Sequence, residues 1–173
     1  MIDAGANPAP LAFDDEVAFA NSIEALLPIG FRLAFAMLRK RDDAEDVVQE
    51  AAMKAWQKRR TFRAGAEPRP WFLAIVVNEC RMIHRRRLRN SIEPLDPEQA
   101  TSPVARLGIE EVDQLRRALA RLGREDRLVL VLRYYLDLPN EEVGRTLGIS
   151  AATARVRVHR AIQRLRPGIE VTL

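Results

Sequence analysis

Near its carboxyl end the 173-residue chain contains the stretch Asn140-Glu-Glu-Val-Gly-Arg-Thr-Leu-Gly-Ile-Ser-Ala-Ala-Thr-Ala-Arg-Val-Arg-Val-His-Arg160. Its apolar spacing predicts a short helix over 139–147 and a longer one over 151–166. Gly148 separates the two helices, and Ser150 is a good N-cap for the second one. Two helices at this spacing are typical of a helix-turn-helix, which places its second helix in the major groove of DNA.

The second of these helices has one apolar face and one basic face. The apolar residues recur at helical steps and are Ala154, Val158, Ala161, Ile162 and Leu165. No acidic residue occurs between 144 and 169, whereas a solvated helix usually mixes both signs of charge. We therefore predict DNA contacts along the basic face, the alternative being a plain helical hairpin with an arginine face. The expected DNA-binding residues are Ser150, Thr153, Arg155, Arg157, Arg160 and Arg164.

The charge of the chain is unevenly distributed. Its 28 basic and 24 acidic residues give a net charge of +4 and a pI near 9.8, and only three of the basic residues are lysine. Arginine dominates two acid-free stretches, 80–92 and 144–169, whereas 42–50 is rich in carboxylates and 93–104 carries a net charge of −3. Such segregation indicates separate surfaces for different partners, the alternative being faces that are simply solvated.

Composition excludes several classes of protein. The single cysteine, Cys80, rules out a disulfide framework and a cysteine-rich zinc site, and we expect a buried or half-buried thiol that is not reactive. Residues 1–16 contain no basic residue, so no secretory signal is predicted. The longest apolar run, Trp71–Val77, is too short to span a bilayer. We expect a cytoplasmic protein without membrane insertion, metal or cofactor, and no nucleophile–base pair or phosphate loop indicates an enzyme.

Every periodic segment of the sequence is typical of a helix, with no alternating strand pattern. We predict an all-α fold of two small helical domains, 13–90 and 105–173. A flexible, acidic and proline-rich linker at 91–104 joins them, and a loose tail at 1–12 precedes them. The expected helices are 14–26, 29–40, 43–59, 70–89, 105–122, 125–136, 139–147 and 151–166.

The predicted helix at 70–89 has Pro70 in its first turn and combines an apolar face with a basic stripe. The expected buried residues are Phe72, Ile75, Val76, Met82 and Ile83. On the stripe, an amide can pair with adenine, guanidinium groups hold phosphates, and an indole ring can stack on an exposed base. The alternative is that Trp71 belongs to the core and Asn78 is merely solvated. The expected nucleic-acid contacts, including the preceding loop, are Arg63, Arg69, Trp71, Asn78, Arg81 and Arg85.

The predicted helix at 43–59, for which Asp42 and Glu45 suggest a capping box, has a polar outer face. The expected inward residues are Ala44, Val47, Val48, Ala51, Ala55 and Trp56. Carboxylates can indicate metal or acid–base chemistry, but these have no histidine partner and no sign of a pocket. An exposed methionine among them favours a protein-docking face over a solvated one. The expected docking residues are Asp46, Gln49, Glu50 and Met53.

Three stretches follow one another in a specific order. The first is Asp43-Ala-Glu-Asp-Val-Val-Gln-Glu50 with Ala55-Trp56, and the second is Arg69-Pro-Trp-Phe-Leu-Ala-Ile-Val-Val-Asn78 with its arginine run. The third comprises Leu119–Leu122, Arg127–Tyr135 and the helix-turn-helix. Together they resemble, over 14–90 and 110–166, the extracytoplasmic-function (ECF) sigma factors, the small two-domain promoter-recognition subunits of bacterial RNA polymerase.

This resemblance implies partners and roles. Asp46, Gln49, Glu50 and Met53 would dock on the β′ clamp of the polymerase core. Asn78 and Arg81, with the 63–69 loop, would hold the −10 promoter element as a single strand. Thr153, Arg155, Arg157 and Arg160 would read the −35 element, and their domain would also bind the β flap. The acidic linker would run toward the RNA exit path, and an anti-sigma factor would regulate the chain.

The sequence also departs from the family pattern. Val156 stands where the family usually has a small polar residue, and Pro139-Asn140 stands where it often has Ser-Tyr. Pro68 and Pro70 flank Arg69 and should stiffen the loop. The alternative from another class is a free-standing helix-turn-helix repressor that dimerises through its first domain.

Overall fold

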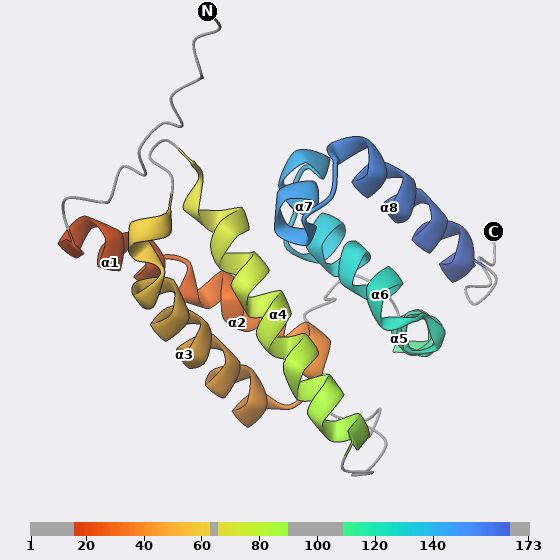
Figure 1. Cartoon of the computed structure of the whole chain (residues 1–173). Coiled ribbons are helices and arrows are strands. Elements are labelled where there is room, and N and C mark those ends of the chain that lie inside the picture. Colours follow the sequence, from red (N-terminus) through yellow and green to blue (C-terminus); the bar gives the residue numbers. More distant parts are fainter. Residues whose placement is uncertain (1–15, 63–65, 90–108, 167–173) are drawn as a thin grey trace, which may run out of the picture.

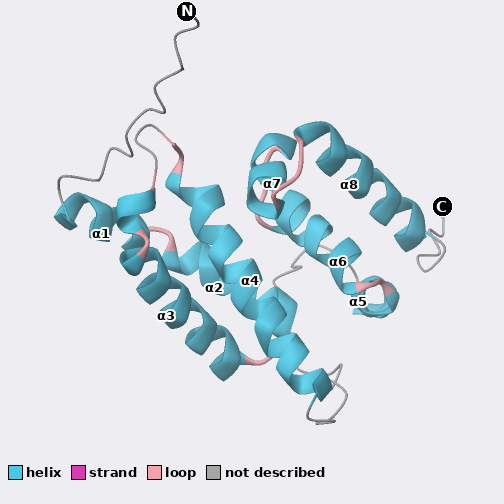
Figure 2. Cartoon of the chain, in the orientation of Figure 1, coloured by secondary structure: helices cyan, strands magenta, loops and turns pink. Residues whose placement is uncertain are grey.

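The computed structural model describes residues 16–62, 66–89 and 109–166, and every regular element within these ranges is a helix (Figures 1 and 2). The all-α prediction is therefore confirmed. The tail at 1–12, Arg63 and the linker at 91–104 lie outside the described residues. Within the described part, no single helix is long and apolar enough to cross a membrane. Only α1 and α2 taken together meet that test, and they bend by 43° between them.

The first group of helices comprises α1 (Glu16–Glu24), α2 (Leu27–Leu38), α3 (Arg41–Gln57), a 3₁₀ turn η1 (Arg59–Thr61) and α4 (Pro68–Arg89). Helices α2, α3 and α4 pack against one another, with α3 and α4 side by side in Figure 1. They enclose large side chains that are fully buried because each helix turns one apolar face inward. These include Phe19, Leu33, Leu38, Phe72, Leu73 and Val76.

The second group comprises α5 (Ile109–Arg121), α6 (Arg124–Leu130), a π-helical segment η3 (Val131–Tyr135), α7 (Asn140–Leu147) and α8 (Ala151–Leu165). Helix α8 packs against both α6 and α7, as Figure 1 shows. Leu128, Leu132, Leu138 and Val143 are buried between them.

The turn between α7 and α8 has the geometry of a helix-turn-helix. Gly148 adopts the left-handed conformation, with φ of 68°, which favours glycine. A Cβ on Gly144 would lie 2.7 Å from the carbonyl oxygen of Ile149, so only glycine allows this close approach of the turn to α7. Ser150 caps α8 by accepting a hydrogen bond from the backbone N–H of Thr153 at 3.1 Å. The predicted cap and break are confirmed.

Three details of the predicted helices are wrong. Helix α3 begins at Arg41 without a capping box, because Glu45 pairs with the side chain of Arg41 at 2.8 Å instead of reaching back to Asp42. Trp56 is 39% exposed and Met82 is 41% exposed, although both were expected to face inward. The ring of Trp56 lies at the surface under the guanidinium of Arg59, 4.3 Å from its centroid.

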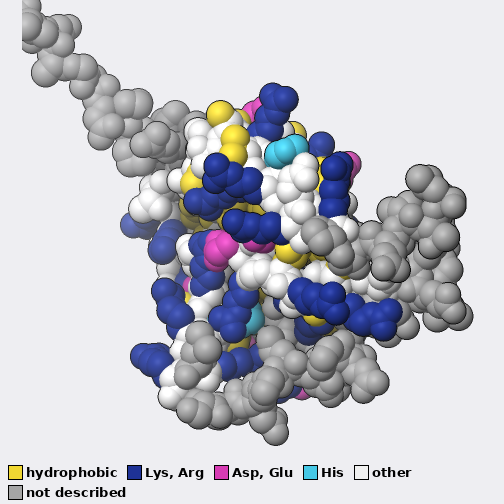
Figure 3. Space-filling model, turned by 90° about the vertical axis from the view of Figure 1, so that its right-hand side faces the viewer, with side chains coloured by type: hydrophobic (Ala, Val, Ile, Leu, Met, Phe, Trp, Pro, Cys, Tyr) yellow, Lys and Arg dark blue, Asp and Glu magenta, His cyan; other side chains and the backbone are white. Residues whose placement is uncertain are grey.

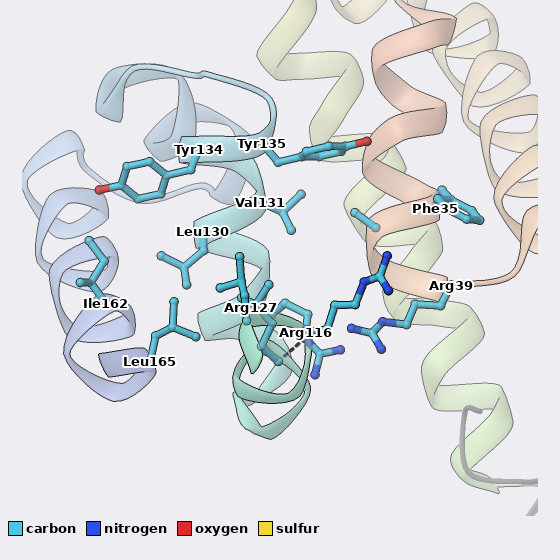
Figure 4. A pocket seen from close by; sticks show the side chains of 13 residues that line it. Phe35, Arg39, Arg116, Arg127, Leu130, Val131, Tyr134, Tyr135, Ile162 and Leu165 are labelled. Atoms are coloured by element: carbon cyan, nitrogen blue, oxygen red, sulfur yellow. Dashed lines mark hydrogen bonds between the residues drawn. The ribbon is translucent and has the colours of Figure 1, made fainter. Parts of the chain in front are cut away.

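The predicted helix at 125–136 changes from an α-helix to a π-helix partway along its length. The chain is α-helical to Leu130 and continues as a π-helical turn, so that the N–H of Leu136 donates to the carbonyl of Val131 at 2.9 Å. A π turn holds one residue more than an α turn and changes the direction of the side chains beyond it. Tyr134 points toward α8 and Tyr135 toward α2 (Figure 4).

Candidate nucleic-acid and protein interfaces

Helix α8 presents a basic face that is open to solvent. Thr153, Arg155, Arg157 and Arg160 are exposed, while Ala154, Val158 and Ala161 are buried against the second group. Lys and Arg side chains gather on the side of the molecule that includes α8, with few carboxylates among them (Figure 3). Such a face attracts a phosphate backbone, because cations without protein partners are free to replace its counterions.

Ion pairing on this face is confined to one end. Arg164 donates to Asp126 at the start of α6, whereas the guanidinium groups of Arg155, Arg157 and Arg160 form no ion pair with any residue of the described ranges. Ser150 and Thr153 bond each other through their hydroxyl groups at 2.8 Å, so Ser150 already serves the cap. The N-terminal half of α8 is thus the more available part of the predicted DNA face.

The predicted stripe on α4 is divided between exposed and paired residues. Asn78 and Arg85 are exposed. Arg69 forms a bidentate ion pair with Glu142 of α7, and its Nε lies 2.7 Å from one carboxylate oxygen. Arg81 forms another with Glu125 of α6, at 3.2 and 2.6 Å. Sequence reasoning missed both acids, because they lie 73 and 44 residues away from their partners.

Trp71 stands on the stripe but belongs to an aromatic cluster. Its ring lies edge-on to Phe62 at 5.1 Å and to Phe19 at 6.2 Å, measured between ring centroids. The side chain is only partly buried, and it ties α1 and η1 to the start of α4. These contacts favour a structural role for the indole over base stacking.

The polar face of α3 is exposed as predicted. Asp46 and Gln49 lie at the surface, and Met53 is 53% exposed. Glu50 pairs with Lys54 at 3.1 Å, and Lys54 also donates to Glu79 of α4 at 2.7 Å. The hydrogen bond from Lys54 to Glu79 raises the pKa of the lysine above its usual value of 10.5. The face therefore combines free acidic and amide groups with a thioether, which is typical of a surface for a protein partner.

An apolar groove lies between α2 of the first group and the helices of the second. Its volume is about 440 Å³, and its residues are Phe35, Ala36, Arg39, Leu115, Arg116, Leu119, Arg127, Leu130, Val131, Tyr134, Tyr135, Ile162 and Leu165. Figure 4 shows Tyr134, Leu130 and the two α8 side chains on one side and Tyr135 and Phe35 on the other. Sequence reasoning missed this groove because it forms only where two distant groups meet.

Three arginines line the same groove, namely Arg39, Arg116 and Arg127. Arg127 donates to the backbone carbonyls of Leu119 and Ala120, each at 3.0 Å. Burial, together with the positive charges of Arg39 and Arg124, lowers the pKa of Arg127 below its usual 12.5. A groove that joins an apolar floor to guanidinium groups suits an amphipathic helix that carries carboxylates.

Two titratable groups of α4, the thiol of Cys80 and the imidazole of His84, are buried. Burial raises the pKa of the Cys80 thiol to about 12, so the thiol stays protonated near neutral pH, as expected for an unreactive cysteine. Burial also lowers the pKa of His84 below 6.5, and the charges of Arg124, Arg87 and Arg127 act in the same direction. His84 is therefore neutral in the folded chain at pH 7.

Comparison with known proteins gives consistent matches. Residues 23–90 match Sigma-70 region 2, and residues 113–165 match Sigma-70, region 4. The chain is 31% identical over 139 residues to RNA polymerase sigma factor SigV of Bacillus subtilis, covering 79% of this chain and 81% of SigV. It is 31% identical over 142 residues to ECF RNA polymerase sigma factor SigL of Mycobacterium tuberculosis, covering 79% of this chain and 80% of SigL.

Solved structures resemble the whole arrangement. The sigma factor RpoE in its complex with the anti-sigma factor NepR, from Bartonella quintana, superposes with a TM-score of 0.73 at 25% identity. The superposition covers 90% of this chain and 99% of RpoE. CnrH in complex with the cytosolic domain of CnrY shares the fold, with a TM-score of 0.65 at 22% identity over 89% of this chain and 88% of CnrH.

Proposed function

The chain belongs to the ECF sigma factors of RNA polymerase, and we propose which of its surfaces contacts each promoter element and which contacts the polymerase. The family consists of transcription initiation factors, so we assign the chain no catalytic step, no cofactor and a place in the cytoplasm beside the polymerase. The comparisons favour this function over that of a free-standing repressor. The observation that carries the assignment of surfaces is the face of α8, where Arg155, Arg157 and Arg160 are exposed without ion-pair partners in the described ranges.

The second domain, 105–173, contacts the −35 element in this proposal. Helix α8 enters the major groove, where Thr153, Arg155 and Arg157 lie nearest the bases because the N-terminal residues of a recognition helix reach base edges. Arg160 and Arg164 then lie nearer the phosphates. Ser150 contributes by holding the first turn of α8 in place.

The first domain, 13–90, holds the −10 element as an unpaired strand. Asn78 supplies an amide that can pair with adenine, and Arg69, Arg81 and Arg85 supply charge for the backbone. Capturing unpaired bases offsets the free energy needed to unstack them, so binding promotes melting. Arg63 is proposed from sequence alone.

The face of α3 formed by Asp46, Gln49, Glu50 and Met53 docks on the β′ clamp of the polymerase core. Its support is the exposure of these side chains on one side of a helix whose other side is buried. The acidic segment 91–104 then leads from one domain to the other through the enzyme, and the second domain rests on the β flap. Core polymerase thereby holds two weak DNA-binding modules at a fixed spacing, which raises the effective concentration of the second.

An anti-sigma factor is the partner that we assign to the apolar groove. One structural neighbour, the sigma factor RpoE, is bound to the anti-sigma factor NepR. The apolar floor and the guanidinium groups of Arg39 and Arg127 fit a helix with one apolar face and flanking carboxylates.

Transcription from purified components tests the proposed function. The chain is mixed with core bacterial RNA polymerase, bound promoters are selected from a genomic library, and run-off transcripts are measured on the selected DNA. We expect promoter-specific transcripts only when the chain is present. Co-purification with core polymerase separates this function from repression, since a repressor would bind a symmetric site tightly without polymerase. The absence of any promoter-specific transcript would contradict the proposal.

A further inference from the structure

One apolar side chain stands in the middle of the basic face of α8. Val156 is 47% exposed, and its neighbours in the sequence, Arg155 and Arg157, are exposed as well. The other large apolar side chains of α8 are buried or half-buried, and they are Val158, Ile162 and Leu165. The core that holds α8 in place therefore does not account for Val156, which the fold leaves at the surface.

Helical geometry places Val156 on the side of α8 that faces away from the rest of its domain. Because successive residues are turned by 100°, it points almost opposite to the buried side of the helix. The residues of that buried side are Ala154, Val158 and Ala161. Arg155 and Arg157 leave the helix about 100° to either side of Val156. A helix in the major groove turns its outermost residues toward the base edges and its flanks toward the phosphates. Val156 is thus directed at the base edges.

The valine and the two arginines differ in reach. The long side chains of Arg155 and Arg157 can extend from the flanks either to a base edge or to a phosphate. Valine is short, and its branched Cβ leaves one preferred rotamer in a helix, so its methyl groups meet only what lies directly beneath them. The backbone at Val156 is also held in place, because Ala154 and Val158 on either side of it are buried. A contact made by this rigid side chain is therefore selective.

The chemistry of valine limits what it can meet in the groove. The side chain offers no hydrogen bond, so covering a base nitrogen, carbonyl or amino group would leave that polar group without a partner. The apolar feature of a base pair in the major groove is the 5-methyl group of thymine. We infer that Val156 contacts a thymine methyl group and thereby fixes one T·A pair of the −35 element. This inference rests on the proposed function and names one base that α8 selects.

The surroundings of Val156 favour DNA over a protein as its partner. Arg155, Arg157 and Arg160 are exposed close to it, and none of them forms an ion pair with a residue of the described ranges. Each of these cations gains by meeting a phosphate, whereas an apolar protein surface would desolvate it without supplying a countercharge. An apolar group among unpaired cations therefore fits a groove whose rims are anionic and whose floor carries methyl groups.

Removing the methyl group from the DNA tests the contact. Each thymine of the −35 duplex that the holoenzyme selects is replaced in turn by uracil, which lacks only that group. Binding by the holoenzyme is then measured in competition with the unmodified duplex, for the wild type and for V156A. One replacement should weaken wild-type binding by about fourfold, the effect of one methyl group that is excluded from water. The same replacement should leave the affinity of V156A unchanged, because the two methyl contacts are lost together.

A matched variant and a folding measurement separate the contact from a general effect of the substitution. V17A shortens an exposed valine of α1 in the same way and should keep the wild-type response to uracil. V156A should unfold at the same urea concentration as the wild type, since its side chain lies at the surface.

Several outcomes would overturn the assignment of Val156. They are a selected −35 element without thymine, a wild type that responds to no uracil replacement, and an equal response in V156A. If V156A weakened assembly with core polymerase but kept the wild-type response to uracil, Val156 would contact a protein and the inference would be wrong. A wild-type holoenzyme that binds no −35 duplex would instead contradict the proposed function itself.

Discussion

Helices α4 and α8 carry the two arginine-rich stretches of the chain, but their arginines have different partners. On α4, Arg69, Arg81 and Arg87 each meet a carboxylate from another helix. On α8, Arg164 alone does so within the described ranges, and the three arginines nearer its N-terminus are exposed. A basic stretch in a sequence therefore does not by itself identify an available surface, because the surrounding fold decides which of its arginines are paired.

Removing the anchor of α4 should have the largest effect. Trp71→Ala opens the cluster with Phe19 and Phe62, and we expect the free energy of unfolding to fall by about 3 kcal/mol, as for other large aromatic truncations. Urea unfolding followed by circular dichroism measures it. Trp56→Ala is the control, because the more exposed ring should cost about 1 kcal/mol. Equal losses would show that Trp71 is not the anchor.

The salt dependence of the α8 face should be the next largest effect. If α8 contacts about four phosphates, the slope of log affinity against log salt should be about −3.6 for a −35 duplex. Affinity then falls roughly a hundredfold between 50 and 200 mM salt. Fluorescence anisotropy of the full chain with the duplex measures the slope. A slope near zero would show that the exposed arginines do not meet phosphates.

Removing one guanidinium group of α8 that we propose to contact a base should have a smaller effect. Arg157→Ala should weaken promoter binding by about 1–3 kcal/mol and relax the preference at one position of the −35 element. Selection of bound duplexes by the variant holoenzyme measures that preference, with Arg121→Ala, an exposed arginine of α5, as the control. Equal loss on every sequence would show that Arg157 only holds phosphate.

Low pH should decrease the free energy of unfolding slightly, through His84 of α4. The pKa of His84 is lowered in the folded chain, so the unfolded chain binds more protons once the pH falls below about 6.5, the ordinary value. The free energy of unfolding should therefore be constant above that pH and decrease below it, by about 1 kcal/mol or less. Urea unfolding at pH 7.5 and 5.5 measures the change. His84→Gln should show a smaller decrease over the same interval, and an identical one would assign it to other groups.

Sequence periodicity predicted the helices well because each buries one regular apolar face. The break at Gly148 and the cap at Ser150 were likewise predictable, since both act on their immediate neighbours. The partners of Arg69 and Arg81 were not, because Glu142 and Glu125 each look like an ordinary acid in the first turn of a helix. No local signal links residues that meet only when two helical groups pack.

The exposure of Trp56 and Met82 has a similar cause. Periodicity assigns an angle around a helix, but the number of neighbouring helices decides how much of that circumference is covered. Both side chains lie at the edge of their apolar faces, where the neighbouring helices leave them at the surface. The groove between α2 and α8 also depends on this coverage, and none of its residues stands out in the sequence.

The π-helical turn at Val131–Tyr135 rotates the part of the chain that follows it about the helix axis. An α-helix advances 100° per residue, so one additional residue in a turn rotates everything that follows by about that angle. Two adjacent tyrosines thus line opposite walls of the apolar groove. Tyr134 points toward α8, and Tyr135 lies beneath Arg32 of α2 (Figure 4). Deleting a single residue there would leave composition, charge and helix content nearly intact and would turn the helix-turn-helix away from the first group.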